Sequence, residues 1–338
     1  MVFEVKYMNI KDIAKKCNLS VATISRVINN DPKVADSTRK KVLSVIDKYK
    51  FVPNITGRSL RTQKSNKILV LLPTMSNQFY SEIIQGIEET AEEKGYAILV
   101  AVTNLQEHQE IKYLHMLRMK HVDGCISLFN TIDAESISSL AKTYPFVQCC
   151  EPTMGADVSS VEINNRQAVY DVVNQFIQKG HKTIGMISGD YYKTSELGRE
   201  TGYKEALRDN GLVFEKSLLV KNFYRYEDGA IGAKKIMAHN PKPTAIVCAS
   251  DSLALGATSY LKSEGYTVGK DICVMGFDNT AITTYTSPTI SSIGQPRYDL
   301  GKESFKLLYE KLENINSTNK KIILPYEIIH RESTGCSK

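Results

Sequence analysis

Two different spacings of hydrophobic residues divide the chain. Up to about residue 53 they recur every three or four positions, the spacing of short helices that bury one face. From Lys67 onward, apolar runs of about five residues alternate with longer helical patterns, as in KILVLLP followed by NQFYSEIIQGIEETAEEKGY. The sequence therefore predicts a small all-α part followed by a large part of alternating strands and helices.

Segment 9–30 predicts two short helices joined by a tight turn. Asn9 and Ser20 are placed to cap them, and Asn18 lies at the reversal, where asparagine tolerates a left-handed backbone. The residues expected on the buried faces are Ile10, Ile13, Ala14, Cys17, Val21, Ile24, Val27 and Ile28. The pattern is typical of a helix-turn-helix, whose second helix enters the major groove of DNA. A two-helix corner of any all-α domain is the alternative.

A third helix is predicted by VADSTRKKVLSVIDKYKFVPN. It starts near Asp36 or Ser37 and ends before Pro53, which stops regular structure. The residues expected to face inward are Val42, Leu43, Ile46 and Tyr49. Three helices of this length can share one small core.

Positive charge is concentrated around the helix-turn-helix pattern. The 338 residues carry a net charge of +6, but residues 1–67 contain 15 Lys and Arg against 5 Asp and Glu. The remaining residues contain 28 against 32, so the large part is slightly acidic. Because neutralising phosphates supplies most non-specific affinity for DNA, only the first part is expected to contact nucleic acid. A merely solvated basic face is the alternative.

Strands that alternate with helices predict parallel sheets with helices on both faces. Two such series within about 270 residues, with SSVEINN and ISSIGQP as crossings, indicate two similar lobes, and a TIM barrel is the alternative. Ligands of such sheets bind at the carboxyl ends of the strands, so a small-molecule cleft is expected between the lobes. No GxGxxG or GxxxxGK[ST] motif follows a strand, which argues against a dinucleotide or nucleoside-triphosphate site.

The composition excludes several other classes of protein. With 42% hydrophobic and 24% charged residues, the chain resembles an ordinary globular protein, and no apolar run approaches the about 20 residues that span a bilayer. We expect a cytoplasmic protein with no membrane partner. The seven cysteines include no CxxC pair and are expected to be reduced, and the six histidines are scattered. We therefore expect no metal, no cofactor and no enzymatic activity.

These motifs together resemble the lactose and galactose repressor family of bacterial transcription regulators. IKDIAKKCNLSVATISRVIN resembles its DNA-binding signature and NITGRSL its hinge helix. NQFYSEIIQGIE, KHVDG, GHKTIGMISG, RETGYKEAL, PTAIVCASDSLALGA, VMGFDN and SPTISSIGQP resemble its effector-domain blocks, in the expected order. The resemblance implies a periplasmic-binding-protein-like effector domain of two doubly wound parallel-sheet lobes behind an all-α helix-turn-helix domain.

The resemblance also implies domain boundaries. The expected parts are an N-terminal arm (1–8), the helix-turn-helix domain (9–53), a hinge helix or linker (54–66) and the effector domain (67–338). Within the last, lobe 1 comprises about 67–163 and 294–323, and lobe 2 about 164–293 and 324–338.

For DNA, the resemblance implies a homodimer on a palindromic operator, of the kind TG(N)AA..CG..TT(N)CA. It assigns base contacts to Val21, Ala22, Ser25 and Arg26, contacts to phosphate or a neighbouring base to Thr23 and Asn29, and further contacts to Asn54 and Leu60 in the hinge. Leu60 would be a wedge that unstacks a base step in the minor groove. Packing of Leu60 on its own domain is the alternative.

For the cleft, Arg199 and Asp278 match positions that bind ligand in the family, and an ordinary salt bridge between the lobes is the alternative. The aromatic candidates for stacking, or else core residues, are Phe79, Tyr80 and Tyr224. The weaker candidates are Ser250, Asp251, Gln295 and, last, Glu151. Asn164 and Asn165 stand where many relatives carry Asp-Asn, so ligand identity does not transfer.

The function implied is repression of genes for carbohydrate or nucleoside catabolism or transport, controlled by a sugar, a sugar phosphate or a nucleoside. One alternative is a sugar- or nucleoside-binding protein or enzyme with the same cleft. A regulator that responds to a phosphorylated carrier protein is another.

Overall fold

The computed structural model describes residues 8–28, 30–51, 64–190 and 193–335. The chain forms two compact units, Met1–Ser65 and Asn66–Lys338, and each is described by itself. Most of the predicted N-terminal arm and of the predicted hinge lies outside the described residues, and so do Asn29, Asn54 and Leu60.

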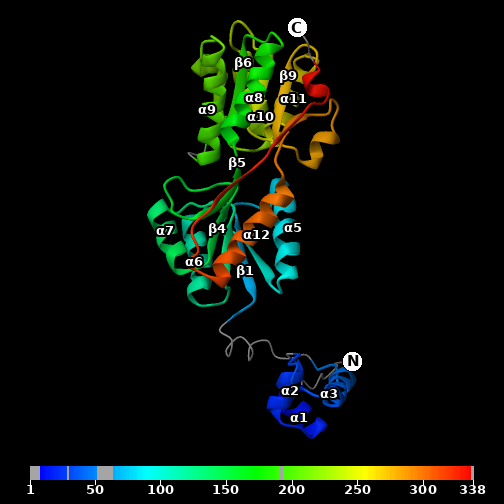
Figure 1. Cartoon of the computed structure of the whole chain (residues 1–338). Helices are drawn as coiled ribbons and strands as arrows, with labels where there is room; N and C mark the ends of the chain where they lie inside the picture. The colour runs from blue at the N-terminus through cyan, green and yellow to red at the C-terminus, as the bar shows by residue number, and fades with distance from the viewer. Residues whose placement is uncertain (1–7, 29, 52–63, 191–192, 336–338) are drawn as a thin grey trace. The chain divides into compact units, whose positions relative to one another are not determined.

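The described residues of the first unit form three helices (Figure 1), α1 (Ile10–Cys17), α2 (Val21–Ile28) and α3 (Asp36–Lys48). The predicted caps are present. The Asn9 side chain accepts hydrogen bonds from the N–H groups of Lys11 and Asp12, and the Asp12 carboxylate accepts one from the N–H of Asn9. Asn18 ends α1 with a φ of +49°, in the left-handed conformation expected of the turn.

The core of this unit confirms most of the predicted pattern and corrects three residues. The buried core residues are Ile13, Ala14, Cys17, Ile24, Val27, Val42 and Phe51. Leu43, Tyr49 and Val21 were expected inside but have exposed fractions of 48%, 37% and 40%. In α3 the positions three and four residues after Val42 are Val45 and Ile46, which pack against the core, so Leu43 is turned toward solvent.

The second unit contains two separate six-stranded sheets, which confirms the two doubly wound lobes and excludes a TIM barrel (Figure 1). The strands of the first sheet, all parallel and in the order β11-β5-β4-β3-β1-β2, are β1 (Lys67–Leu72), β2 (Ala97–Val102), β3 (Gly124–Ser127), β4 (Phe146–Cys149), β5 (Ser159–Ile163) and β11 (Lys321–Leu324). Those of the second, in the order β12-β10-β9-β8-β6-β7, are β6 (Ile184–Gly189), β7 (Leu219–Asn222), β8 (Ala245–Cys248), β9 (Cys273–Asp278), β10 (Ser291–Gly294) and β12 (Glu327–Ile329). Only β12 is antiparallel to its neighbour in this sheet.

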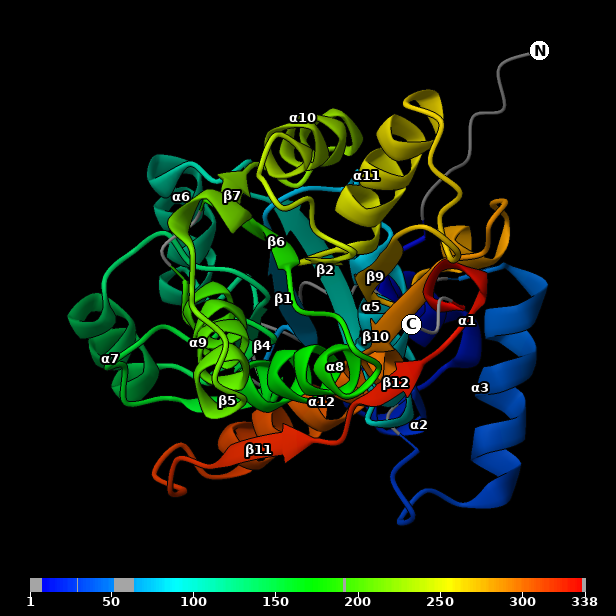
Figure 2. The same ribbon diagram turned by 90° about the horizontal axis from the view of Figure 1, so that it is seen from above.

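Helices cover both faces of each sheet. In the first lobe these are α5 (Phe79–Glu93), α6 (Glu107–Arg118), α7 (Ala134–Thr143) and α12 (Arg297–Glu313). In the second they are α8 (Asn165–Gln178), α9 (Thr194–Asp209), α10 (Tyr226–Met237) and α11 (Asp251–Ser263), with short 3-10 turns at Lys216–Leu218, Ala281–Thr284 and Glu332–Thr334. Figure 2 shows the second sheet between the α8–α9 pair and the α10–α11 pair.

The chain crosses between the lobes three times, after β5, β10 and β11. Gly294 ends β10 in the second sheet and Leu324 ends β11 in the first, and the last two crossings follow these residues. The expectation of reduced cysteines is wrong at Cys273, which is disulfide-bonded. No helix in the described part of the chain is long and apolar enough to cross a membrane.

Candidate nucleic-acid interface and ligand cavity

The outer face of α2 carries the side chains expected to read bases. Ile24 and Val27 anchor the helix in the core, which leaves Val21, Ala22 and Arg26 exposed. Thr23 and Ser25, also expected at the interface, are partly exposed. The side chains of this face are therefore small and apolar at the start of the helix, at Val21 and Ala22, and capable of hydrogen bonding further along.

Two local contacts fix the ends of this helix. Ser20 Oγ accepts a hydrogen bond from the N–H of Thr23 at 3.1 Å, so the predicted cap of α2 is present. Beyond the helix, the Arg39 guanidinium donates to the carbonyl oxygen of Asp31 at 2.7 Å. Arg26 lies 3.9 Å from the Asp31 carboxylate, a distance too long and a position too exposed to immobilise its side chain. Among the described residues of this unit, the exposed lysines, which can contact phosphates, are Lys11, Lys15, Lys16, Lys33, Lys40, Lys41, Lys48, Lys50 and Lys64.

A cavity lies between the two lobes at the carboxyl ends of their strands. The volume of this cavity is about 150 Å³. The first lobe contributes Pro73, Thr74, Asn77, Phe79, Tyr80, Leu105, Leu128, Phe129, Cys150 and Glu151. The second lobe contributes Lys193, Ser195, Glu196, Arg199, Tyr224 and Asp278, and Gln295 comes from a crossing. Of the candidates from the sequence, Phe79, Tyr80, Arg199, Tyr224, Asp278, Gln295 and Glu151 line this cavity.

Arg199 is held in place by neutral groups. Its Nε donates to Asn165 Oδ1 at 2.9 Å, its Nη1 donates to the carbonyl oxygen of Ala249 at 2.7 Å, and its guanidinium lies 3.8 Å from the centre of the Phe277 ring. Asn165, the second residue of the Asn164-Asn165 pair, thus orients the arginine. Its neighbour Asn164 caps α8 by accepting from the N–H of Gln167. Arg199 is therefore preorganised toward the cavity.

Asp278 occupies a strained position at the end of β9. Its φ of +102° is unusual for a residue with a side chain, and such strain is typical of functional sites. One carboxylate oxygen accepts a hydrogen bond from Gln295 Nε2 at 2.8 Å. Burial raises the pKa of Asp278 to about 7, against the opposing effect of Arg199. No ion pair joins Arg199 to Asp278 among the described residues, and both belong to the second lobe, so the alternative of a salt bridge between lobes does not hold.

Glu151 and Glu196 bring two further carboxylates to the cavity. Glu151 accepts hydrogen bonds from the N–H of Ser195, at 3.1 Å, and from its hydroxyl. Glu196 accepts from Ser188 Oγ at 3.0 Å and from the N–H of Gly189 at 2.9 Å. Burial raises the pKa of both glutamates. Sequence reasoning ranked Glu151 last and missed Glu196.

Lys193 and Phe129 were also missed. Lys193 Nζ donates to the carbonyl oxygen of Asn130 at 2.5 Å and lies 4.7 Å from the centre of the Phe129 ring. The contact joins the loop before α9 to the loop after β3, so it bridges the lobes. The one signal in the sequence is that both residues follow a strand.

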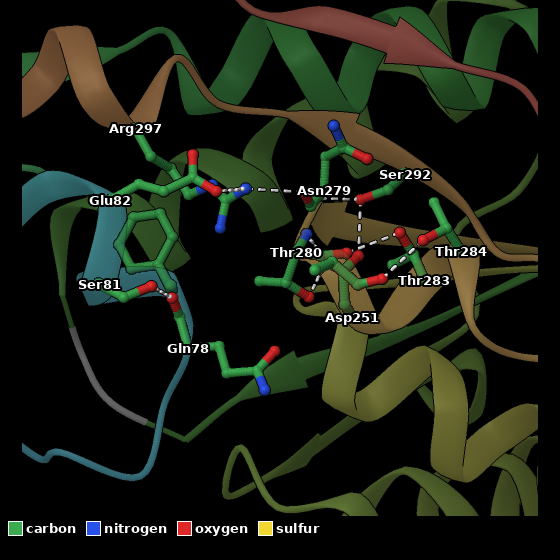
Figure 3. Close-up of polar contacts among 12 residues, drawn as sticks. Gln78, Ser81, Glu82, Asp251, Asn279, Thr280, Thr283, Thr284, Ser292 and Arg297 are labelled. Atoms are coloured by element: carbon green, nitrogen blue, oxygen red, sulfur yellow. Dashed lines mark hydrogen bonds and ion pairs between the residues drawn. The ribbon is translucent and has the colours of Figure 1, made fainter.

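Ser250 and Asp251 do not line the cavity, which corrects their selection. Ser250 caps α11 by accepting from the N–H of Leu253 at 3.2 Å. Asp251 is 2% exposed and accepts from the N–H and hydroxyl of Thr280 and from Ser292 Oγ (Figure 3). Burial raises its pKa to about 6. These bonds fix the loop directly after Asp278, so Asp251 supports the cavity from behind.

A further contact between the lobes lies at the start of α12. The Arg297 guanidinium pairs with the Glu82 carboxylate of α5 at 2.7 Å and donates to the carbonyl oxygen of Asn279 in the second lobe at 2.9 Å (Figure 3). Hydrogen bonds and an ion pair thus join the two lobes both near Glu151 and Lys193 and at Arg297. Within the described residues no group of three or more His, Cys, Asp or Glu is arranged to hold a metal ion.

Comparison with known families matches both units of the chain. Residues 9–54 match the family described as bacterial regulatory proteins, lacI family, and residues 65–332 match periplasmic binding proteins and the sugar binding domain of the LacI family. The chain belongs to the LacI family of bacterial regulatory proteins. It is a DNA-binding regulator of transcription with a periplasmic-binding-protein-like domain.

Individual relatives of this LacI-family chain align over nearly its whole length. Catabolite control protein A of Priestia megaterium is 33% identical over 329 residues, covering 97% of this chain and 99% of the relative. The transcriptional repressor CytR of Escherichia coli K12 is 33% identical over 325 residues, covering 96% and 95%. These relatives are transcriptional regulators, which are not enzymes.

Solved structures agree on the fold. The lac repressor dimer bound to operator and an anti-inducer has a TM-score of 0.88 at 22% identity, over 97% of this chain and 99% of that one. The regulator CcpA of Lactococcus lactis has a TM-score of 0.73 at 28% identity, over 79% and 98%.

Proposed function

We propose that this protein is a dimeric repressor whose affinity for a palindromic operator is set by a small molecule bound between the two lobes. The observation that carries the proposal is the cavity, which is lined from both lobes and contains a preorganised arginine and three carboxylates. A ligand there contacts both lobes at once, so its binding favours one relative arrangement of the lobes over others.

For operator recognition we propose α2 as the reading helix. Val21 and Ala22 would contact thymine methyl groups, and Arg26 would make a bidentate contact with a guanine. Thr23 and Ser25 would add hydrogen bonds to bases or phosphates. Asn29, Asn54 and Leu60, which lie outside the described residues, complete the proposed set, with Leu60 as the minor-groove wedge.

We propose that the regulated genes serve the catabolism or transport of carbohydrates or nucleosides. We also propose that the protein is located in the cytoplasm. The names of two relatives support this direction, a catabolite control protein and the repressor CytR. A cleft with aromatic side chains and directional polar groups suits hydroxylated rings.

Fluorescence anisotropy of the full chain tests operator binding. The probe is a duplex of the form TG(N)AA..CG..TT(N)CA, titrated over a series of salt concentrations, with a scrambled duplex as the control. We expect specific binding in the nanomolar range that weakens as salt rises, and a markedly weaker affinity for the scrambled duplex. Equal affinity for the two duplexes at every salt concentration refutes the proposal.

A further inference from the structure

The two walls of the cavity differ in chemistry. The first lobe contributes the aromatic rings of Phe79, Tyr80 and Phe129. The second contributes mostly charged side chains, Lys193, Glu196, Arg199 and Asp278, with one ring, Tyr224, and the first lobe adds a single carboxylate, Glu151. A ring with one apolar face and an edge of polar groups is complementary to this pair of walls, because the apolar face stacks on the aromatic side chains and the edge meets the charges.

The position that would best bind an anion is already occupied by the protein. The N-terminus of α9, a helix of 16 residues, lies at the cavity, which Ser195 and Glu196 of its first turn line. There the Glu151 carboxylate accepts hydrogen bonds from the N–H and the hydroxyl of Ser195. The nearby ammonium of Lys193 already donates to a carbonyl oxygen of the first lobe. A ligand phosphate would have to displace a protein carboxylate from this helix end.

Two carboxylate oxygens remain available to a ligand. Asp278 uses one oxygen to accept from Gln295, and Glu196 uses one to accept from Ser188 and Gly189. Their other oxygens, Asp278 Oδ2 and Glu196 Oε1, accept no hydrogen bond from the described part of the chain. A Cβ atom added at Gly189 would lie 2.6 Å from Glu196 Oε1 and 2.6 Å from the Tyr224 ring, so this glycine allows the carboxylate and the ring to come together.

The charges in the cavity also disfavour an anion. Glu151, Glu196 and Asp278 line it together with two cations, Lys193 and Arg199. A phosphate ester would add about two negative charges next to three carboxylates whose ionised forms burial already disfavours, as their raised pKa values show, and repulsion between buried like charges is costly.

We infer that the cavity binds a hydroxylated ring without phosphate, either neutral or bearing an amine, and discriminates against its phosphate ester. The inference rests on the proposed function, because it describes the ligand of that same cavity. At about 30 Å³ for each water molecule, the volume of about 150 Å³ corresponds to about five waters, which matches a ligand of about one sugar ring and not a longer oligosaccharide.

A matched panel of ligands tests the inference on the full chain. The probes are ribose and ribose 5-phosphate, glucose, glucosamine and glucose 6-phosphate, and cytidine and its 5′-monophosphate. Thermal unfolding identifies the members that stabilise the protein, and titration calorimetry then gives their Kd. We expect at least one unphosphorylated member to bind and its phosphate ester to bind about tenfold more weakly or worse.

Charge-neutral variants show whether the discrimination comes from the cavity. Asp278→Asn and Glu196→Gln should each raise the Kd of the unphosphorylated ring. They should also reduce the ratio between the Kd of the phosphate ester and the Kd of its unphosphorylated parent. Glu92→Gln, an exposed position near the end of α5, is the matched control and should change neither.

The outcomes separate this inference from the proposed function. A phosphate ester that binds the wild-type protein as well as or better than its parent overturns the inference and leaves the proposed function standing. Unaltered discrimination in both cavity variants overturns the assignment to the carboxylates. If no member of the panel binds the wild-type protein, both the inference and the proposed ligand cavity are refuted.

Discussion

Glu151 in the first lobe and Ser195 in the second lobe are joined by two hydrogen bonds, with the glutamate carboxylate accepting from the N–H and from the hydroxyl of the serine. Thr194 adds a third bond by donating to the carbonyl oxygen of Pro152 at 2.7 Å. The start of α9 is thereby held against the opposite lobe, beside the cavity. The same bonds that exclude an anion from the helix end also close the cavity on this side.

Glu151→Gln should weaken ligand binding. A glutamine side chain has one acceptor oxygen in place of two and no charge to offer the N-terminus of α9, so the closed arrangement of the lobes loses stability. Charged hydrogen bonds of this kind contribute about 1.5–3 kcal/mol, and we therefore expect the Kd of the tightest unphosphorylated probe to rise about tenfold or more. Titration calorimetry measures it.

The matched control for this variant is Glu107→Gln, which removes the same charge from an exposed position at the start of α6. It should leave the Kd unchanged. Equal Kd values for Glu151→Gln and the wild-type protein would show that this contact does not contribute to closure.

The buried aspartates predict an unusual dependence of stability on pH. The pKa of Asp278 is raised to about 7 and that of Asp251 to about 6, in both cases mainly by burial. In the unfolded chain an aspartate titrates near about 3.9, so between that value and the raised pKa the folded state binds more protons than the unfolded state. These two groups therefore lower the free energy of unfolding as pH rises from about 4 to about 7.

Urea unfolding at several pH values between about 4.5 and 7.5 tests this dependence. Asp278→Asn should flatten the decline, most clearly in the upper half of the range, where Asp251 contributes less. A matched variant at an exposed aspartate, Asp47→Asn on α3, should retain the decline. A wild-type free energy of unfolding that rises over this range, together with no flattening in Asp278→Asn, would contradict the assignment.

Arg26→Ala should reduce operator affinity and specificity without affecting the fold. The side chain is exposed on α2 and makes only a long, solvent-screened contact with Asp31, so its removal leaves no buried group unpaired. Loss of a bidentate contact with guanine costs about 1–3 kcal/mol, or about five- to more than a hundredfold in Kd. Fluorescence anisotropy with operator and scrambled duplexes measures the loss, and the affinity for the scrambled duplex should fall much less.

The control for Arg26→Ala is Arg118→Ala, an exposed arginine at the end of α6 in the second unit. Its operator affinity should equal that of the wild-type protein. A loss in Arg26→Ala that is the same for both duplexes would assign Arg26 to phosphate contacts only.

The local parts of the fold could be predicted from the sequence, because their signals lie within a few residues of each other. Asn9 with Asp12 and the left-handed Asn18 are of this kind. The direction of a side chain after a strand could not. Asp251 and Asp278 both follow apolar strand patterns, yet only Asp278 lines the cavity, because Asp251 is bound from behind by Thr280 and Ser292, which come from later in the chain.

Lys193 and Glu196 show the same limit for the cavity itself. Their role depends on the first turn of α9 meeting the opposite lobe, a contact between segments more than 40 residues apart in the case of Ser195 and Glu151. Leu43 illustrates this limit in the core of the first unit. Which of the adjacent hydrophobic residues Val42 and Leu43 is buried depends on which face of α3 the other helices cover, and the sequence of α3 alone does not give that face.

Gly301→Ala should destabilise the first lobe. α5 and α12 pack closely in this lobe, and a Cβ atom at Gly301 would lie 2.0 Å from the backbone oxygen of Ile83, which cannot move away as a flexible side chain can. Separating the two helices costs about 1–3 kcal/mol or more, because the residues packed beneath them lose their contacts. Urea unfolding should show a lower midpoint with an unchanged slope. Glu88→Ala, at an exposed position on α5, introduces an alanine without this clash and should leave the midpoint nearly unchanged. Equal midpoints for Gly301→Ala and the wild-type protein would mean that the helices can separate at no cost, contrary to the close packing of their backbones.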